Sequence, residues 1–376
     1  MSTEHPHFDI AIVGAGMAGA ALAYHLAGRR SVVLIEREEQ PGYHATGRSA
    51  AIFIPTYGNR HVRLLTRAST SFLAQPPTGF AQAALLSPRG SLRLCLPGEE
   101  AALRAHHADV AREAPEACLR SADFAAGAVP ILRANRIGLA MHVADAQEID
   151  VAALHSGFLR GHARAGGELM LNADVLALSR DKTCWRAETR TGAITATTLV
   201  NAAGAWGDVL ASMAGVAPLG LSVLRRSAAL LPGPSGHDAK TWPMVTDLNE
   251  TYYFKPDAGK LLVSPAEEIP SEPMDAWVDD LDLAEGLQRF SDATTMEVTR
   301  VDRSWAGLRT FARDRSPVIG FDPAAPDFFW SVGQGGYGIQ TAPAWGELAA
   351  NLLCGASTDK VIEGLDIGAL NPKRFA

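Results

Sequence analysis

The chain opens with apolar residues arranged first as a strand and then as a helix. Residues 8–13 (FDIAIV) form a short apolar run of strand type. From Ala18 to Leu26 apolar residues recur at helical spacing, and Gly28 provides a stop signal. A second apolar run over 31–35 (SVVLI) ends at Glu36. Apolar runs flanking a helix are typical of parallel strands buried on both faces, so the pattern predicts a β-α-β unit.

The rest of the chain mixes strand and helix patterns, which predicts a mixed α/β fold. A run rich in β-branched residues over 193–200 leads into Asn201 and the small residues 202–204, which suits a parallel strand pointing at a cofactor. The other expected elements are strands from 85 onwards, a helix over 151–165, a strand pair over 168–179 and 184–191, a strand-rich stretch over 219–310 and a last helix over 339–353.

Three glycines and one carboxylate indicate what the first unit could bind. Gly14 permits a tight turn, Gly16 lets the backbone approach a pyrophosphate, and Gly19 allows the helix to pack closely on the strand. The helix N-terminus stabilises phosphate charge. Glu36 lies 22 residues after Gly14, where a carboxylate meets a ribose hydroxyl and disfavours the 2′-phosphate of NADP. The unit is therefore interpreted as a dinucleotide site.

Composition and charge narrow the class of protein. The 376 residues carry a net charge of −7 and the pI is about 5.9, values that argue against a nucleic-acid binder. The N-terminal segment 1–8 does not resemble a signal peptide, and no apolar stretch has the length of a transmembrane span. The four cysteines are far apart and form no metal or disulfide pattern, which favours a reducing, cytoplasmic location.

Two observations favour FAD over NAD as the dinucleotide. No second GxGxxG follows a strand, so a separate nicotinamide site is not expected. Small-residue segments at 42–51 (GYHATGRSAA) and 333–338 (GQGGYG) could bring backbone amides close to a large cofactor.

In order along the chain, GAGMAG, Glu36, HATGRSAA, VNAAGAW, WAGLR and GQGGYGIQT resemble the superfamily of D-amino-acid oxidase, glycine oxidase and sarcosine oxidase. Within it the chain is most similar to bacterial D-amino-acid dehydrogenases of the D-arginine dehydrogenase type. The resemblance implies a Rossmann-like domain with non-covalently bound FAD, made of residues 1–80, 145–215 and 311–376. It also implies an inserted substrate domain of residues 81–144 and 216–310, with a mixed, largely antiparallel sheet.

The resemblance also implies which residues contact FAD. Besides the glycines of the first turn and Glu36, they come from the two small-residue segments, a neighbouring arginine and one later strand. The expected cofactor residues are Gly14, Gly16, Ala18, Gly19, Glu36, Arg37, Ala45, Thr46, Gly47, Arg48, Ser49, Ala50, Ala51, Val175, Gly335, Tyr337, Gly338 and Ile339. The N-terminal dipole of the last helix would face the flavin pyrimidine, where charge collects on reduction.

An amino acid oxidised by flavin must be held by its carboxylate with its α-hydrogen aimed at flavin N5. The planar guanidinium of arginine binds a carboxylate through two parallel hydrogen bonds, and Arg309 is the leading candidate. Arg226 resembles a second carboxylate-facing arginine. Tyr57 and Tyr253 resemble tyrosines that line the pocket. Contacts between flavin and substrate are expected from Gly336 and Gln340.

Two positions depart from the enzymes that prefer basic D-amino acids. Ile52 stands where those enzymes have a histidine, and Ser91 stands where they have a glutamate that pairs with the cationic end of the substrate. Loss of that partner would cost a cationic substrate roughly 2–4 kcal/mol. Neutral or hydrophobic D-amino acids are therefore expected to be preferred over arginine and lysine.

The sequence thus predicts an FAD-dependent D-amino-acid dehydrogenase or oxidase without a metal. Hydride transfer from the α-carbon would give an imino acid that hydrolyses to a 2-oxo acid and ammonia. The electron acceptor is expected to be a quinone-like carrier or oxygen. The alternatives are a secondary-amine oxidase acting on sarcosine, glycine or a proline derivative, a 2-hydroxy-acid dehydrogenase, and a non-catalytic flavoprotein subunit.

Overall fold

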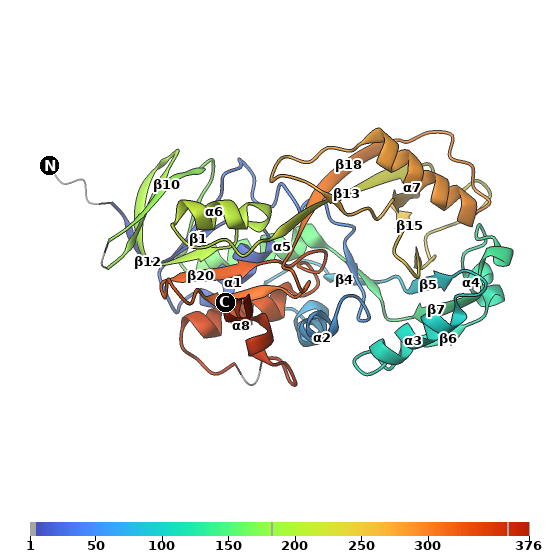
Figure 1. Ribbon diagram of the computed structural model, residues 1–376, viewed down its shortest axis with the longest axis horizontal. Coiled ribbons are helices and arrows are strands. Elements are labelled where there is room, and N and C mark those ends of the chain that lie inside the picture. Colours follow the sequence, from blue (N-terminus) through green and yellow to red (C-terminus); the bar gives the residue numbers. More distant parts are fainter. Residues whose placement is uncertain (1–4, 182, 359–360, 376) are drawn as a thin grey trace.

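A computed structural model of the chain describes residues 5–181, 183–358 and 361–375. The first residues of the polar N-terminal segment, 1–4, lie outside this part. Two large sheets occupy opposite halves of the molecule, and two long strands of the second sheet, β13 (Ser222–Leu231) and β18 (Arg303–Phe311), extend towards the first (Figure 1).

The first sheet has a parallel centre. β1 (His7–Val13) lies between β12 (Gly192–Asn201) and β2 (Val32–Ile35), and it is parallel to both. All four residues of β2 and the last four of β1 are buried, as expected for strands covered on both faces. The remaining strands are β9 (Glu168–Met170), β10 (Val175–Arg180), β11 (Trp185–Thr189), β19 (Val318–Phe321) and β20 (Phe328–Val332).

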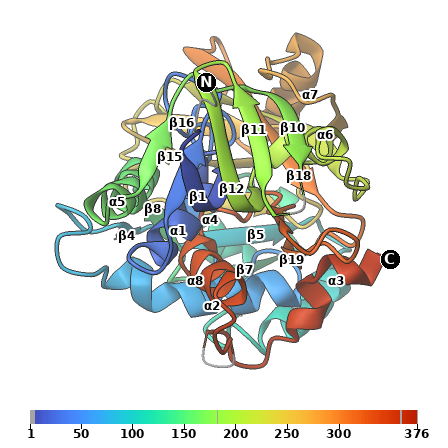
Figure 2. The ribbon, with the colours of Figure 1, turned by 90° about the vertical axis from the view of Figure 1, so that its left-hand side faces the viewer.

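Helices cover one face of this sheet, with α1 (Met17–Leu26) against α8 (Ala342–Leu353) and α5 (Val151–Arg164) (Figure 2). Ala20, Ala21 and Ala23 of α1 are fully buried, so small side chains set the distance between these helices. A Cβ added at Gly346 in α8 would lie 2.6 Å from the carbonyl oxygen of Ala21, which shows how closely the two helices approach. The other helices of this half are α2 (Arg60–Ala74), α6 (Gly207–Met213) and the 3-10 turns Gly204–Trp206, Ile367–Leu370 and Pro372–Phe375.

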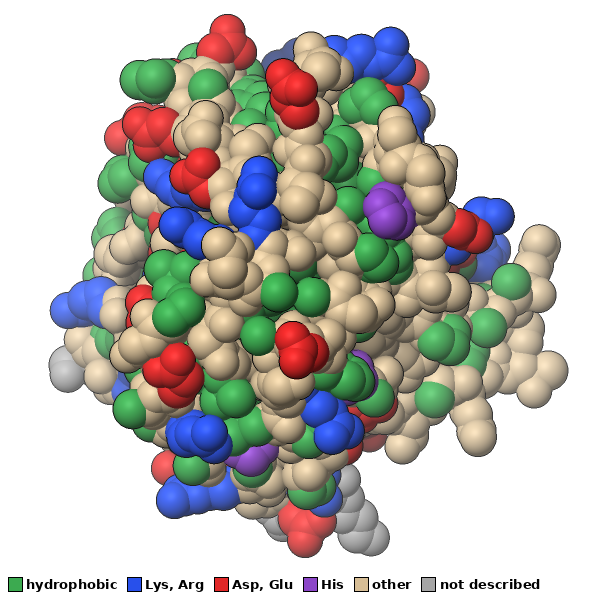
Figure 3. Space-filling model, turned by 90° about the vertical axis from the view of Figure 1, so that its right-hand side faces the viewer, with side chains coloured by type: hydrophobic (Ala, Val, Ile, Leu, Met, Phe, Trp, Pro, Cys, Tyr) green, Lys and Arg blue, Asp and Glu red, His purple; other side chains and the backbone are tan. Residues whose placement is uncertain are grey.

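The second sheet is antiparallel except where β14 (Met244–Asp247) runs parallel to β5 (Ser91–Cys95). Its other strands are β6 (Cys118–Arg120), β7 (Leu139–Val143), β13, β15 (Tyr253–Asp257), β16 (Lys260–Ser264), β17 (Ile269–Pro270) and β18. Around it lie α3 (Glu100–Val110), α4 (Ala122–Ala128), α7 (Asp280–Ala293) and the 3-10 turn Ala134–Arg136. The end of the molecule that carries this sheet has acidic and basic side chains interspersed over the face drawn in Figure 3.

A third, small sheet joins segments that are far apart in the chain. It consists of β3 (Ile52–Phe53), β8 (Gln147–Ile149) and β4 (Leu86–Pro88), with β8 in the middle and both neighbours antiparallel to it. This sheet was not anticipated from the sequence, because two or three residues are too few to produce a recognisable hydrophobic period.

The mixed α/β fold expected from the sequence is confirmed, with two corrections to its elements. The expected strand 168–179 is two strands, β9 and β10, because the chain turns at Asn172, whose φ of 52° breaks an extended run. The expected helix 339–353 begins only at Ala342, since residues 336–341 form turns before it.

Candidate active site

Two glycines of the first turn, Gly14 and Gly19, occupy positions where a larger residue would clash with backbone atoms. Gly14 has a φ of +104°, and a Cβ there would lie 2.4 Å from the carbonyl oxygen of Ala202 at the end of β12. A Cβ at Gly19 would lie 2.0 Å from the carbonyl oxygen of Gly14, so helix and turn are in direct contact. At Gly16 the nearest atom is the Thr46 hydroxyl oxygen at 3.4 Å, and the backbone faces the cavity. The turn therefore has the open backbone that a pyrophosphate requires.

Glu36 closes this unit as a buried carboxylate. One oxygen accepts the backbone N–H of Ala15 at 2.9 Å, and the other accepts that of Glu38 at 3.1 Å. The side chain is 7% exposed and lines the cavity, so its remaining lone pairs can accept ribose hydroxyls. Next to it the Arg37 guanidinium lies 4.9 Å from the ring centre of Trp206. The indole of Trp206, from the VNAAGAW motif, also lines the cavity and provides a flat apolar surface next to Arg37.

The segment after β2 wraps along the same cavity. Thr46 accepts the N–H of Met17 at 3.0 Å, which fixes the segment on the helix N-terminus. Arg48 donates to the carbonyl oxygens of Ala276 and Ala306, each at 3.0 Å, and pairs with Asp275. Arg48 therefore connects the first small-residue segment to the second large sheet.

One cavity of about 340 Å³ runs from the glycine turn to the second sheet. Most of the site residues expected from the sequence line it: Gly14, Gly16, Ala18, Glu36, Arg37, Ala45, Thr46, Arg48, Ser49, Ala50, Ala51, Ile52, Tyr57, Val175, Arg226, Tyr253, Arg309, Gly335, Gly336, Gly338, Ile339 and Gln340.

Four expected residues are outside this lining. Gly19 is covered by the turn, and the N–H of Gly47 bonds the carbonyl of Gly42 at 2.8 Å. Tyr337 is buried behind Tyr57, with ring centres 5.0 Å apart, and burial raises its pKa to about 12. Ser91 is buried at the start of β5, paired with Met244. These residues support the wall and do not form its surface.

Two arginines face the cavity from adjacent strands. Arg226 of β13 is directly opposite Gly307 of β18, and Arg309 is two residues further along β18. Because side chains alternate along a strand, both guanidinium groups lie on the same face of the sheet. Gly307 adds no side chain between them, and a Cβ there would lie 3.4 Å from the Cβ of Arg48. The pair is thus placed to bind one carboxylate from two sides.

Each arginine is held by its own partners. Arg309 donates to the Tyr57 phenol oxygen at 3.0 Å. Burial disfavours the charged form of Arg309 and by itself would lower the pKa of its guanidinium. The neighbouring Tyr57 and Tyr253 have a larger effect in the opposite direction, so this pKa is raised. Arg226 donates to the carbonyl of Glu267 and to the carboxylate of Glu268, both at 3.1 Å. Burial, and then the nearby charge of Arg309, lower the pKa of Arg226.

Gly336 affects Arg309 directly, whereas Gln340 acts on the segment that leads to Tyr57. A Cβ at Gly336 would lie 2.6 Å from an Arg309 nitrogen, so only glycine leaves the guanidinium in place. Gln340 accepts the N–H of Ile54 at 3.0 Å and donates to the Thr66 hydroxyl at 2.8 Å. Its polar atoms are therefore used on the protein, and it holds the segment that leads to Tyr57.

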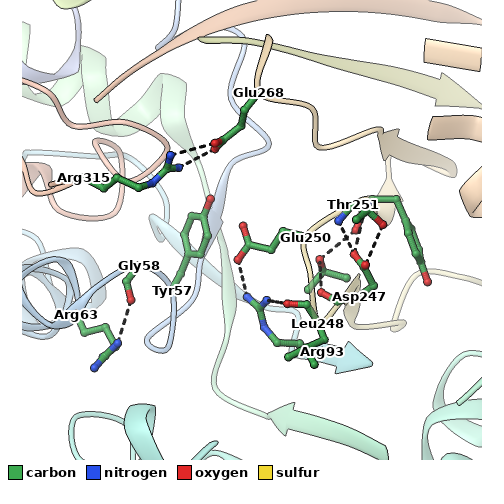
Figure 4. Close-up of polar contacts among 12 residues, drawn as sticks. Tyr57, Gly58, Arg63, Arg93, Asp247, Leu248, Glu250, Thr251, Glu268 and Arg315 are labelled. Carbon is green, nitrogen blue, oxygen red and sulfur yellow. Dashed lines mark hydrogen bonds and ion pairs between the residues drawn. The ribbon is translucent and has the colours of Figure 1, made fainter. Parts of the chain in front are cut away.

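Sequence reasoning missed a polar pair in the part of the cavity that the second sheet lines, which is called its substrate end below. Arg93 of β5 and Glu250, in the turn after β14, both line it and are hydrogen bonded at 2.8 Å (Figure 4). Nothing in their sequence context marks them, because a charged residue alternating with apolar ones in a strand resembles an ordinary exposed position. Parallel pairing of two strands more than 150 residues apart brings them together.

Throughout the described residues, no group of His, Cys, Asp or Glu side chains is arranged to hold a metal ion. Within the same ranges no helix is long and apolar enough to cross a membrane.

Comparison with known proteins assigns the family. Residues 9–352 match the model of the DAO family, described as FAD dependent oxidoreductase. The chain belongs to this family. FAD is therefore its cofactor, and the open glycine turn and buried Glu36 fit that dinucleotide.

Individual relatives are distant. Glycine oxidase of Bacillus subtilis is 24% identical, covering 92% of this chain and 93% of its own. Mitochondrial dimethylglycine dehydrogenase of Mus musculus is 26% identical over 98% of this chain, which spans only 44% of that protein. Among solved structures, glycine oxidase from Geobacillus kaustophilus has a TM-score of 0.82 at 24% identity and 99% coverage of both chains. L-proline dehydrogenase from P. horikoshii has a TM-score of 0.84 at 20% identity, covering 99% of this chain and 98% of that one. These structures share the fold.

Proposed function

We propose that the protein oxidises D-amino acids with neutral or hydrophobic side chains, in preference to arginine and lysine. The observation that carries the proposal is the pair Arg226 and Arg309, which share one face of the sheet and open into the cavity that contains the dinucleotide turn. The D configuration is proposed from the likeness of the site motifs to D-amino-acid dehydrogenases.

In this proposal the two arginines bind the α-carboxylate. Tyr57 assists, because its oxygen already accepts a hydrogen bond from Arg309 and its O–H can donate to the substrate. Tyr253 packs beside the carbon skeleton. The main contribution of these residues is orientation, since a fixed α-C–H bond removes much of the entropic barrier.

FAD supplies the acceptor for the hydride that leaves the α-carbon. The ammonium group releases a proton to water, the imino acid adds water, and ammonia leaves to give the 2-oxo acid. The chain needs no acid–base residue for these steps. Its residues bind the carboxylate and restrict the orientation of the α-carbon.

The proposed exclusion of cationic side chains now has a different basis from the one expected. Ser91 lies outside the cavity, and a carboxylate, Glu250, lies inside it. This carboxylate is already paired with Arg93. A substrate guanidinium would have to compete with Arg93 for this carboxylate, so it would gain less free energy of binding than it would from an unpaired carboxylate.

A second candidate is oxidation of a secondary amine such as sarcosine. The similarity to glycine oxidase and dimethylglycine dehydrogenase favours it, because the same arginine pair would hold those substrates. Activity on N-methylglycine relative to D-alanine separates the two candidates.

The deciding experiment is anaerobic mixing of the FAD-loaded protein with D- and L-amino acids while the yellow flavin absorbance is followed. We expect D-leucine, D-methionine and D-phenylalanine to reduce the flavin faster than D-arginine, and the L-isomers to be inert. D-arginine far ahead of the neutral substrates would contradict the specificity, and no reduction by any amino acid or amine would favour a non-catalytic subunit. Hydrogen peroxide formation in air distinguishes oxygen from a quinone-like carrier as the acceptor.

A further inference from the structure

The substrate end of the cavity contains a donor and an acceptor held side by side. Arg93 donates from one nitrogen to the Glu250 carboxylate at 2.8 Å and from another to the carbonyl of Leu248 at 3.1 Å (Figure 4). The Arg93 side chain is 12% exposed and that of Glu250 37% exposed, so the carboxylate presents the more open surface to the cavity.

The turn that carries Glu250 is braced in an unusual conformation. Glu250 has a φ of 53°, in the left-handed region that residues with a side chain rarely adopt. Asp247 holds it there by accepting the N–H of Thr251 at 2.6 Å and its hydroxyl at 2.8 Å. A strained residue kept in place by its neighbours and facing a cavity points to a role in the site.

Strand register places Arg93 in line with Tyr253, the residue proposed above to pack beside the substrate. Arg93 is opposite Thr246, and Thr246 is opposite Tyr253. All three line the cavity, so they form one row on the same face of the sheet. Adjacent strands are about 4.8 Å apart, which puts the backbone of Arg93 roughly 10 Å from that of Tyr253. A side chain that extends past Tyr253 reaches the pair.

The charges of the pair select among side chains. A substrate carboxylate would be repelled by Glu250, and a substrate ammonium or guanidinium would be repelled by Arg93. An apolar group would displace water from both partners and leave their free hydrogen-bonding positions unsatisfied. A carboxamide is neutral, and it offers a carbonyl oxygen to Arg93 and an NH₂ group to Glu250.

We propose that Arg93 and Glu250 form a subsite for a side-chain carboxamide, so that amino acids of the glutamine and asparagine type are the preferred substrates. This inference rests on the proposed function, because it concerns the side chain of an amino acid held by Arg226 and Arg309. Within the neutral substrates, it ranks polar side chains that carry a paired donor and acceptor above apolar ones.

The test compares kcat/KM for D-glutamine, D-glutamate and D-methionine with the FAD-loaded wild-type protein. The first two have the same shape and differ in charge, and the third has a similar length without a donor or a carbonyl. We expect D-glutamine to exceed both by at least about tenfold, because each rival leaves one partner unsatisfied or repelled. If D-methionine is oxidised as efficiently as D-glutamine, the subsite is absent while the proposed function stands. If no amino acid reduces the flavin, the proposed function fails first.

Two substitutions should change the ratio of kcat/KM between substrates, which would not change if Arg93 and Glu250 only stabilised the fold. In Arg93→Met the ratio of D-glutamine to D-methionine should fall at least about tenfold. In Glu250→Gln the guanidinium loses its counter-charge, so the ratio of D-glutamate to D-glutamine should rise by a similar factor. Arg104→Met, an exposed arginine on α3, is the matched control and should leave both ratios unchanged. An unchanged ratio of D-glutamine to D-methionine in Arg93→Met would overturn the inference. If that variant does not fold, the comparison of the three substrates with the wild-type protein decides.

Discussion

Arg309 and Tyr57 are joined by a hydrogen bond of 3.0 Å in which the guanidinium donates to the phenol oxygen. They come from distant parts of the chain, on strand β18 and in the loop before α2. The contact orients both groups before a substrate arrives, because it fixes one N–H of the arginine and leaves the phenol proton available.

Arg309→Met should lower kcat/KM for D-amino acids by at least about thirtyfold, since a buried guanidinium that binds a carboxylate is worth about 2–5 kcal/mol. Arg303→Met, an exposed arginine on the same strand, is the control and should change kcat/KM by less than about threefold. Steady-state kinetics on the FAD-loaded proteins measures both. Equal activity of the Arg309 variant and the parent would remove the basis of the proposed function.

Gly336→Ala should raise KM by about tenfold or more, because the new methyl group would lie 2.6 Å from an Arg309 nitrogen and displace it. Gly127→Ala is the matched control, since nothing lies within 4 Å of a Cβ at that position of α4. Kinetics with one D-amino acid, together with the flavin spectrum, checks this prediction. A Gly336 variant with the parent's KM would show that the guanidinium does not need its observed position.

Glu36→Leu should weaken FAD binding by roughly ten- to a hundredfold, because it removes a charged acceptor from two backbone N–H groups as well as from the ribose. Glu39→Leu alters an exposed carboxylate three residues away and serves as the control. Titration of the apoprotein with FAD gives both dissociation constants. Similar constants for the two variants would place the ribose elsewhere.

His25→Phe should make the protein less sensitive to acid. Burial, and then the charge of Arg29, lower the pKa of His25 from 6.5 to about 4. Among the described residues its Nε2 atom has no hydrogen-bond partner, and the ring packs near Phe72 and Phe158. Between pH 6.5 and pH 4 the unfolded chain binds a proton that the folded protein does not, so wild-type stability falls as the pH falls through this window.

Phenylalanine does not bind that proton. At pH 5 the variant should therefore gain about 2 kcal/mol of unfolding free energy relative to its difference from wild type at pH 8. Urea denaturation at the two pH values measures this quantity. The same difference at both values would mean that His25 is protonated in the folded state.

The features that the sequence predicted best were those set by local chemistry. The glycine turn, β1, β2 and Glu36 follow from hydrophobic runs and from glycine's conformational freedom, which neighbours in the chain decide. Arg226 and Arg309 could be named from their motifs. Their placement on one face of adjacent strands depends on a register that the sequence does not encode locally.

The parts that escaped prediction depend on contacts between distant segments. Arg93 and Glu250 meet only because β5 pairs with β14, and Ser91, two residues from Arg93, is buried outside the cavity. The last helix starts at Ala342, where turns over 336–341 replace its expected first residues and bring Gly336 against Arg309. In each case tertiary packing outweighed the local pattern.

The small sheet of β3, β8 and β4 connects the segment before Tyr57 to a strand of the second large sheet. Glu148 at its centre binds Lys255 of β15 at 2.8 Å and Arg89, next to β4, at 3.2 Å, while β3 leads directly to Tyr57. β15 also carries Tyr253, so this sheet is connected to both of the tyrosines that line the cavity. A displacement of Tyr57 or of Tyr253 would therefore be restrained by the same three short strands.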